Sequence, residues 1–299
     1  GGVADDDVRR AGARVNLERY AAAVRGDERY RKPRRIPPTK TERALGRFDC
    51  IHAPCTEGCP ADQNVPDDLY LVGQGRSEEA LQVVLKTNPL PAITGAVCDH
   101  PCMTKCVRNL YDKPLAIREI KRFITERVAD KPRPQAAAGL GKSVAVVGAG
   151  PAGLAASYYL ALGGFAVSLI DAREAPGGVP AQMIPSYRLP DSSLAEDIAR
   201  VRELGVETRF GVKVGKDVSL AELMEQNDYV FVGIGAHRSI PLKIENEDAP
   251  GVHDCLELLS QVRTGCQVEL GKRALVVGGG NSAMDAARKH RVEGRCRLK

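Results

Sequence analysis

The apolar residues follow one pattern before about residue 138 and a different pattern after it. In the first part they recur every three or four positions, the spacing of an amphipathic helix. Such stripes are formed by Leu69, Val72, Ala80, Leu81, Val84 and Leu85, and again by Ile117, Ile120 and Ile124. In the second part, helical segments alternate with the apolar runs SVAVVGAG, AVSLIDA, DYVFVGIG and RALVVGGG. We expect a helical region followed by an α/β region with a parallel sheet.

Polar segments indicate where these regions begin and end. Residues 1–39 are charged and predict a tail or short helix that closes in RYRKPRRIPPTK. Within the helical region, Ser77 followed by Glu78 and Glu79 predicts a helix start, and NPLP predicts a stop. The stretch KPRPQAAAGLGK has the composition of a linker. The helical region is therefore expected to span residues 40–138.

A glycine-rich turn follows the first apolar run of the α/β region. Gly148, Gly150 and Gly153 are spaced as G-x-G-x-x-G between a strand and a helix, and the next strand ends in Asp171. In this context the glycines permit a tight turn, close approach of a pyrophosphate and helix–strand packing, and the acid can bond ribose hydroxyls. The pattern predicts a dinucleotide site; the alternative is a tight structural turn.

A second glycine turn is formed by Gly278, Gly280 and Ala283, with Asn281 at the expected helix start. Two dinucleotide sites in one chain suggest two nucleotides, and a flavin and a nicotinamide are a pair that can exchange hydride. Residues 139–250 are therefore expected to form the first nucleotide-binding region. Residues 251–299 are expected to begin a second, truncated one.

Six cysteines lie in two groups within the helical region: Cys50, Cys55 and Cys59, and Cys98, Cys102 and Cys106. The second group has intervals of four, which on a continuous helix would place all three thiols on one face. The CTEGCP stretch resembles the C-x3-C-P ending in which the last cysteine ligates the other cluster of a pair. Zinc is the alternative, although zinc motifs more often contain C-x2-C. Cys255, Cys266 and Cys296 are expected to be packing residues, and His237 a surface residue.

Composition narrows the function classes further. The net charge of +5 results from 43 basic and 38 acidic residues without an RNA-type aromatic motif, which argues against nucleic-acid binding. No apolar run reaches the roughly 18 residues of a membrane span, and the first residues lack the apolar core of a secretory signal. We therefore expect no membrane partner and a cytoplasmic location, where thiols stay reduced.

The order of helical cysteine region, GAGPAGLAAS, PGGVPAQMIPSYRLP, VGIGAHRS and VVGGGNSAMDAAR resembles the small (beta) subunit family of glutamate synthase. This family includes the N-terminal half of dihydropyrimidine dehydrogenase and a group named as selenate reductase subunits. TNPLPAITGAVCDHPC and LAIREIKRF are most similar to the latter group. The resemblance implies an α/β oxidoreductase, a helical double-cluster region and two Rossmann-type regions. Electrons would pass from NAD(P)H through FAD and [4Fe–4S] clusters to a catalytic partner subunit or domain.

The same resemblance implies the residues of each site and no catalytic side chain. The implied FAD ligands are Gly148, Gly150, Pro151, Ala152, Gly153, Asp171, Gly177, Gly178, Ile184, Pro185, Arg188 and Gly235. The nicotinamide nucleotide would lie at Gly278, Gly280, Asn281 and Ala283. One cluster would take Cys50, Cys55 and Cys106, and the other would take Cys59, Cys98 and Cys102.

Two departures from the family leave each cluster one cysteine short. Arg47 replaces the first cysteine, and Lys121, with Glu119 nearby, stands where relatives often have a Glu or Gln ligand. Asp49, His52, Asp99 and His100 are candidate fourth ligands. One complete cluster with two spare thiols is the alternative to two clusters. The alternative function is a non-catalytic, zinc-stabilised helical module fused to a nucleotide-binding scaffold.

Overall fold

The computed structural model describes residues 53–128, 131–266, 268, 270 and 273–292. All of them belong to one compact unit. The predictions for residues 1–39, Arg47, Asp49, Cys50, His52 and Cys296 lie outside the described residues. Within the described part of the chain, no helix is long and apolar enough to cross a membrane.

The cysteine region is helical throughout its described length, as predicted. Its elements are α3 (Pro54–Glu57), α4 (Val65–Gly73), α5 (Ser77–Leu85), α6 (Pro91–Val97), α7 (Pro101–Thr104), the 3-10 turn η1 (Val107–Leu110) and α8 (Ile117–Arg127). Proline stands in the first turn of α3, α4, α6 and α7, where its missing N–H costs no hydrogen bond. A proline cannot continue a helix from the residues before it, so each of these prolines separates its own helix from the preceding segment.

The predicted apolar stripes form the core of this region. Leu81 and Leu85 of α5 pack against Ile124 and Val128 at the end of α8. The start of α5 at Ser77 is confirmed, and Arg76 is its N-cap. Asn64 caps α4, because its side chain accepts a hydrogen bond from the amide of Asp67.

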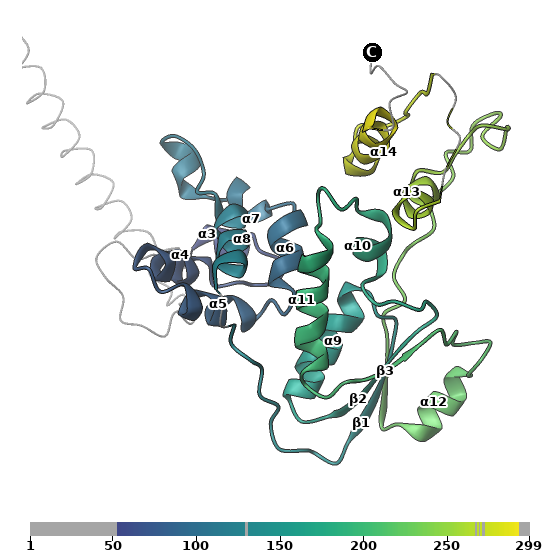
Figure 1. Cartoon of the computed structure of the whole chain (residues 1–299). Coiled ribbons are helices and arrows are strands. Elements are labelled where there is room, and N and C mark those ends of the chain that lie inside the picture. Colours follow the sequence, from purple (N-terminus) through teal and green to yellow (C-terminus); the bar gives the residue numbers. More distant parts are fainter. Residues whose placement is uncertain (1–52, 129–130, 267, 269, 271–272, 293–299) are drawn as a thin grey trace, which may run out of the picture. The chain divides into compact units, whose positions relative to one another are not determined.

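The second region is α/β, as predicted, with the parallel strand order β3-β2-β1-β4. Its elements are β1 (Ser143–Val147), α9 (Pro151–Leu162), β2 (Ala166–Asp171), α10 (Gly178–Met183), α11 (Asp191–Arg202), β3 (Glu207–Phe210), α12 (Leu220–Gln226) and β4 (Tyr229–Val232). Val144 and Val146 pack with the core under α9 and α11, whereas Ala145 and Val147 pack with Leu223 of α12. Helices therefore cover both faces of the sheet (Figure 1).

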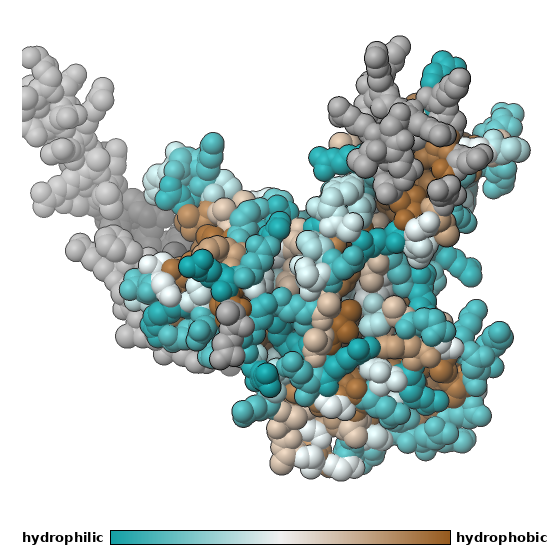
Figure 2. All heavy atoms as spheres, in the orientation of Figure 1, coloured by the Kyte–Doolittle hydropathy of each residue, from teal (hydrophilic) through white to brown (hydrophobic). Residues whose placement is uncertain are grey.

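The last part of the described chain differs from prediction. The apolar run RALVVGGG forms no strand within residues 273–280, and Leu275 and Val277 are exposed. The run pairs with none of the described strands, so no ladder of hydrogen bonds holds it in a sheet. Helices α13 (Cys255–Arg263) and α14 (Asn281–Val292) flank the segment. Figure 2 shows exposed hydrophobic residues around α13.

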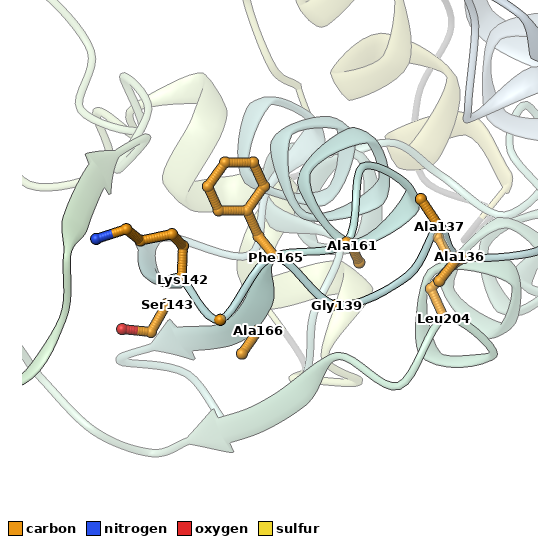
Figure 3. Close-up of a pocket in the computed structure, with 11 residues that line it drawn as sticks. Ala136, Ala137, Gly139, Lys142, Ser143, Ala161, Phe165, Ala166 and Leu204 are labelled. Atoms are coloured by element: carbon orange, nitrogen blue, oxygen red, sulfur yellow. The ribbon is translucent and has the colours of Figure 1, made fainter.

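The predicted linker lies along the α/β region and contains no helix or strand in its described residues 131–142. The amides of Ala137 and Leu140 donate to the carbonyls of Leu162 and Gly164. Beside them is a shallow hollow of about 400 Å³ at the amino ends of β1 and β2, lined among others by Lys142 and Phe165 (Figure 3). The glycine turn lies at the opposite end of β1, so this hollow is not the predicted nucleotide site.

Candidate cofactor sites

The first glycine turn requires glycine at two positions for steric reasons. Gly148 ends β1 with a φ of +104°, and a Cβ there would lie 2.4 Å from the carbonyl oxygen of Gly233. A Cβ on Gly153 would lie 1.7 Å from the carbonyl oxygen of Gly148. Helix α9 therefore starts in direct contact with the end of β1. This is the close strand–helix packing that the fingerprint predicts.

A second glycine pair approaches this turn from a distant part of the sequence. A Cβ on Gly178, whose φ is +56°, would lie 2.7 Å from the Cα of Gly150. The amide of Gly177 donates to the carbonyl of Ala149 at 2.8 Å. The structure thus brings together two stretches that the family resemblance assigns to one nucleotide. Small residues at the contact leave the backbone open to a ligand.

Asp171 lies at the end of β2, beside this turn. Its carboxylate accepts hydrogen bonds from the amide of Ala149 at 2.6 Å and from the amide of Arg173 at 2.9 Å. These bonds fix the side chain next to the turn, and each oxygen retains a lone pair for a ribose hydroxyl. Asp171 fits its predicted role, which stays a prediction.

The other predicted flavin residues lie in several places. Pro151 and Ala152 open α9, which has twelve residues, and Ile184 packs on the core below the turn. Pro185 begins the loop after α10, where its carbonyl accepts from the amides of Arg188 and Leu189. Gly235 has a φ of +72° in the segment after β4.

The three cysteines of the second group do not share one helix, so that expectation is wrong. Cys98 caps the end of α6 in an extended conformation, Cys102 lies in α7, and Cys106 precedes η1. His100 and Pro101 break the helix: His100 is left-handed at φ +49° and ψ +47°, and proline cannot continue a helix.

The described thiols nevertheless converge. The pKa of the Cys55 thiol is raised to about 11, mainly by burial, with smaller contributions from the neighbouring Cys106 and Cys102. Burial also raises the pKa of Cys102, with added effects from Cys59 and Cys98. Gly58 provides a contact between the two groups, because a Cβ on it would lie 2.9 Å from Cγ of Lys105. Cys55 interacts with Cys102 as well as with Cys106, so these contacts bring the two cysteine groups together, and the interleaved assignment stays a prediction.

The side-chain atoms near the cysteines show whether these residues could bind iron. Among the described residues, no three His, Cys, Asp or Glu side chains are close enough to share a single metal ion. A cubane cluster has a wider ligand shell than one ion, and thiolates are its usual ligands. The partly or fully buried, mutually interacting thiols therefore fit iron–sulfur clusters, although Cys50 lies outside the described residues.

The candidate fourth ligands in the described chain are placed very differently. Asp99 is exposed and accepts a hydrogen bond from Asn281 at 3.3 Å. Glu119 is exposed and pairs with Arg118 at 2.7 Å. Lys121 is only 8% exposed and acts electrostatically on Cys102 and on the buried Asp68. His100 has an Nδ1 atom that is buried and has no hydrogen-bond partner among the described residues.

The second glycine turn is formed although its strand is not. Gly278 has a φ of +120°, with Ala283 3.7 Å from a Cβ built on it, and Gly280 precedes α14. Asn281 reaches the cysteine loop through Asp99. These glycines fit a nucleotide turn, and the assignment stays a prediction.

Sequence reasoning missed two buried carboxylates. Asp285 of α14 accepts from Arg188 at 2.5 Å and from the hydroxyl of Tyr187 at 3.2 Å. Asp197 of α11 is fully buried and accepts from the amides at the start of α6. Asp197 belongs to no motif, and Asp285 lies in the VVGGGNSAMDAAR stretch without a predicted role, so only the tertiary contacts identify what these two carboxylates do.

The predictions for Cys255 and His237 agree with the structure, whereas the prediction for Cys266 does not. Cys255 is half-buried and its thiol donates to the carbonyl of Ser282, so it packs as expected. Cys266 is exposed, so its expected packing role is wrong; it follows the last turn of α13, where the chain leaves the fold. His237 is exposed, as expected.

Two family profiles match the chain. Residues 36–132 match the family described as dihydropyrimidine dehydrogenase domain II, 4Fe-4S cluster. Residues 142–294 match the family described as pyridine nucleotide-disulphide oxidoreductase. The first match favours iron–sulfur over the zinc alternative, and the second agrees with the predicted nicotinamide cofactor.

Curated relatives extend over most of the chain. The beta subunit of NADPH-Fe(3+) oxidoreductase from Geobacter sulfurreducens is 36% identical, covering 86% of this chain and 39% of the relative. The beta subunit of NADP(+)-dependent formate dehydrogenase from Moorella thermoacetica is 38% identical, covering 80% and 38%. The glutamate synthase [NADPH] small chain of Escherichia coli is 32% identical, covering 81% and 54%. The chain thus spans about two-fifths to one-half of these relatives, and the predicted resemblance is confirmed.

Proposed function

Because the chain belongs to the pyridine nucleotide-disulphide oxidoreductase family, we propose that it relays electrons from NAD(P)H through FAD to two [4Fe–4S] clusters. The observation that carries this proposal is the convergence of Cys55 with Cys106 and Cys102, and of Cys102 with Cys59 and Cys98, in a chain that also contains a strand–glycine turn–helix unit. When bound, the nicotinamide would supply hydride, the flavin would convert two-electron into one-electron transfer, and the clusters would carry single electrons.

FAD would be held by the two glycine stretches that meet at Gly150 and Gly178. The amides in the first turn of α9 point towards this contact and favour an anionic pyrophosphate there. Asp171 is fixed by two backbone amides and offers its remaining lone pairs to a ribose. The chain would therefore bind and orient the dinucleotide without any side chain acting as acid or base.

The helical region would hold the clusters and limit access of water to them. Cys102 lies in an apolar cluster with Val65 and Ile117, against which Cys55, Leu69 and Met103 pack. Iron binding requires the thiolate form, so assembly would release protons from these buried thiols. Their raised pKa values favour the neutral thiol in the metal-free protein and make assembly pH-dependent.

The electron acceptor would be a partner subunit or domain. Two relatives are named as beta subunits and a third as a small chain, which supports a catalytic partner for this chain too. All three names include NADPH or NADP(+), so NADPH is the first donor to test. We infer a cytoplasmic location because iron-binding thiols need a reducing compartment.

The test is cofactor analysis of the full chain after anaerobic reconstitution. We expect about eight irons and eight sulfides per chain, together with released FAD, because each [4Fe–4S] cluster contributes four of each atom. Visible absorbance should bleach with dithionite and with NADPH. A colourless protein with stoichiometric zinc would contradict the proposal and support the structural module. About four irons would support one cluster.

A further inference from the structure

His100 combines two unusual features between two cysteines of one group. Its backbone is left-handed, which is unfavourable for a residue with a Cβ, and its imidazole Nδ1 is buried without a hydrogen-bond partner in the described chain. Burying an unsatisfied polar atom adds a further energetic cost. Two such costs at one residue suggest that a ligand offsets them.

The position of His100 indicates which ligand. Its amide donates to Sγ of Cys98 at 3.3 Å, and α7, which contains Cys102, begins at the next residue. Cys98 and Cys102 interact electrostatically with each other, and Cys59 joins them. His100 therefore lies between two thiols of the group that the family resemblance assigns to one cluster and leaves one ligand short.

The other candidate fourth ligands near this group lack a suitable lone pair or are bonded to other residues. Lys121 of α8 presents an ammonium, which has three donors and no lone pair for iron. Glu119 pairs with Arg118, and Asp99 is exposed and bonded to Asn281. His100 alone among the described candidates offers a buried, unbonded acceptor atom.

We propose that His100, through Nδ1, is the fourth ligand of the [4Fe–4S] cluster held by Cys59, Cys98 and Cys102. The neutral imidazole donates its Nδ1 lone pair to the fourth iron and keeps its proton on Nε2, so no oxidant or reductant is needed. Glu119 lies close enough to His100 for its carboxylate to orient the ring. This inference rests on the proposed function, because it requires the clusters to form.

The experiment is pulsed EPR of the reduced, reconstituted full chain labelled with ¹⁵N-histidine. We expect a hyperfine coupling of directly bound nitrogen in the wild-type protein and its loss in His100→Cys. The cysteine variant should keep about eight irons and have a lower reduction potential at one cluster, because replacing cysteine by histidine raises the potential. His253→Ala, at an exposed histidine, should leave the coupling unchanged.

The outcomes separate this inference from the proposed function. A wild-type protein without iron would overturn both. A protein with clusters but no histidine coupling would overturn only the ligation by His100. Coupling that persists in His100→Cys would assign the nitrogen to another histidine and would also overturn it. If His100→Cys does not assemble, His100→Ala with about four irons and unchanged circular dichroism would support the proposal.

Discussion

The amide of Ile93 donates a 2.8 Å hydrogen bond to the carboxylate of Asp197, a residue 104 positions later. Asp197 also accepts from the amide of Ala92 and from Arg200, so one buried carboxylate joins α6 of the cysteine region to α11 of the α/β region. Leu90 and Ile93 extend this connection, because both lie in the same apolar core as Val146. The two regions are thus packed together through α6.

This carboxylate makes stability pH-dependent. Burial raises the pKa of Asp197 to about 6, against the opposing effects of the Ile93 amide and Arg200. A raised carboxyl pKa means that the folded protein binds this proton more tightly than the unfolded protein, so raising the pH through the window from about 4 to 6 costs stability. Between pH 5 and 7 we expect Asp197 to lower the free energy of unfolding by about 1 kcal/mol.

The variant Asp197→Asn tests this assignment by urea unfolding at pH 5 and pH 7. The asparagine does not titrate, so the difference between the two pH values should change by about 1 kcal/mol relative to wild type. The variant should also be less stable at both values, because its NH2 group faces donors. Equal pH dependence in both proteins would show that Asp197 does not titrate in this window.

Gly153→Ala should disrupt the first nucleotide turn. Its Cβ would lie 1.7 Å from the backbone carbonyl of Gly148, so α9 must shift away from β1. We expect a loss of about 1–3 kcal/mol in stability and a marked loss of FAD binding, measured by denaturation and by fluorescence of retained flavin.

The matched control is Gly73→Ala at the end of α4. A Cβ there meets nothing within 4 Å, and alanine is favoured over glycine in helices by about 1 kcal/mol. We therefore expect unchanged or slightly higher stability and normal flavin content. If Gly153→Ala behaves like Gly73→Ala, the steric account of the turn is wrong.

Much of the fold could be predicted because local patterns and packing agree. The stripe containing Leu81 and Leu85 packs as expected, and the apolar run around Val146 is a buried strand. The strand predicted at Leu275 is absent from the described part of the chain, because a strand also needs a neighbouring strand to pair with it, and an apolar composition alone does not ensure that pairing. The spacing of four residues around Cys102 did not produce one continuous helix, because Pro101 cannot continue a helix from the preceding residues.

The candidate sites show a similar division. The fingerprint located the contact between Gly148 and Gly153, because its geometry depends on short-range spacing. It could not locate the meeting of Gly150 with Gly178, which depends on how α10 packs. Asp285 was missed for the same reason, since its role depends on a loop that precedes it by nearly a hundred residues.

Asp285→Ala should loosen α14. The change leaves Arg188 and Tyr187 without their buried partner, and breaking a buried ion pair costs about 3 kcal/mol. We expect faster hydrogen exchange of α14 amides and unchanged exchange in β1. Asp191→Ala is the control: Asp191 pairs with Arg263, but its side chain is 77% exposed, so the loss should be below about 1 kcal/mol. Similar exchange in both variants would mean that Asp285 does not anchor the helix.

Single cysteine variants test the two proposed ligand groups. Cys55→Ala and Cys106→Ala should remove the same EPR signal, whereas Cys98→Ala and Cys102→Ala should remove the other, each with loss of about four irons. Cys255→Ala should change neither signal, because its thiol contacts Ser282 outside both groups. A signal lost equally in Cys55→Ala and Cys98→Ala would contradict the interleaved arrangement.

Lys121 provides a test of electrostatics at the cluster. Its ammonium is buried beside Cys102, and Ile117, one turn earlier on α8, lies in the same apolar cluster as that thiol. A nearby positive charge stabilises the reduced cluster, because reduction adds negative charge, and burial weakens screening by water. In Lys121→Met we therefore expect a lower midpoint potential for one cluster in an EPR-monitored redox titration. Lys121→Arg should retain the wild-type value, and Lys105→Met, which removes an exposed charge next to Cys106, should cause a smaller shift. Equal shifts in the two methionine variants would show that burial of Lys121 has no special effect on the cluster.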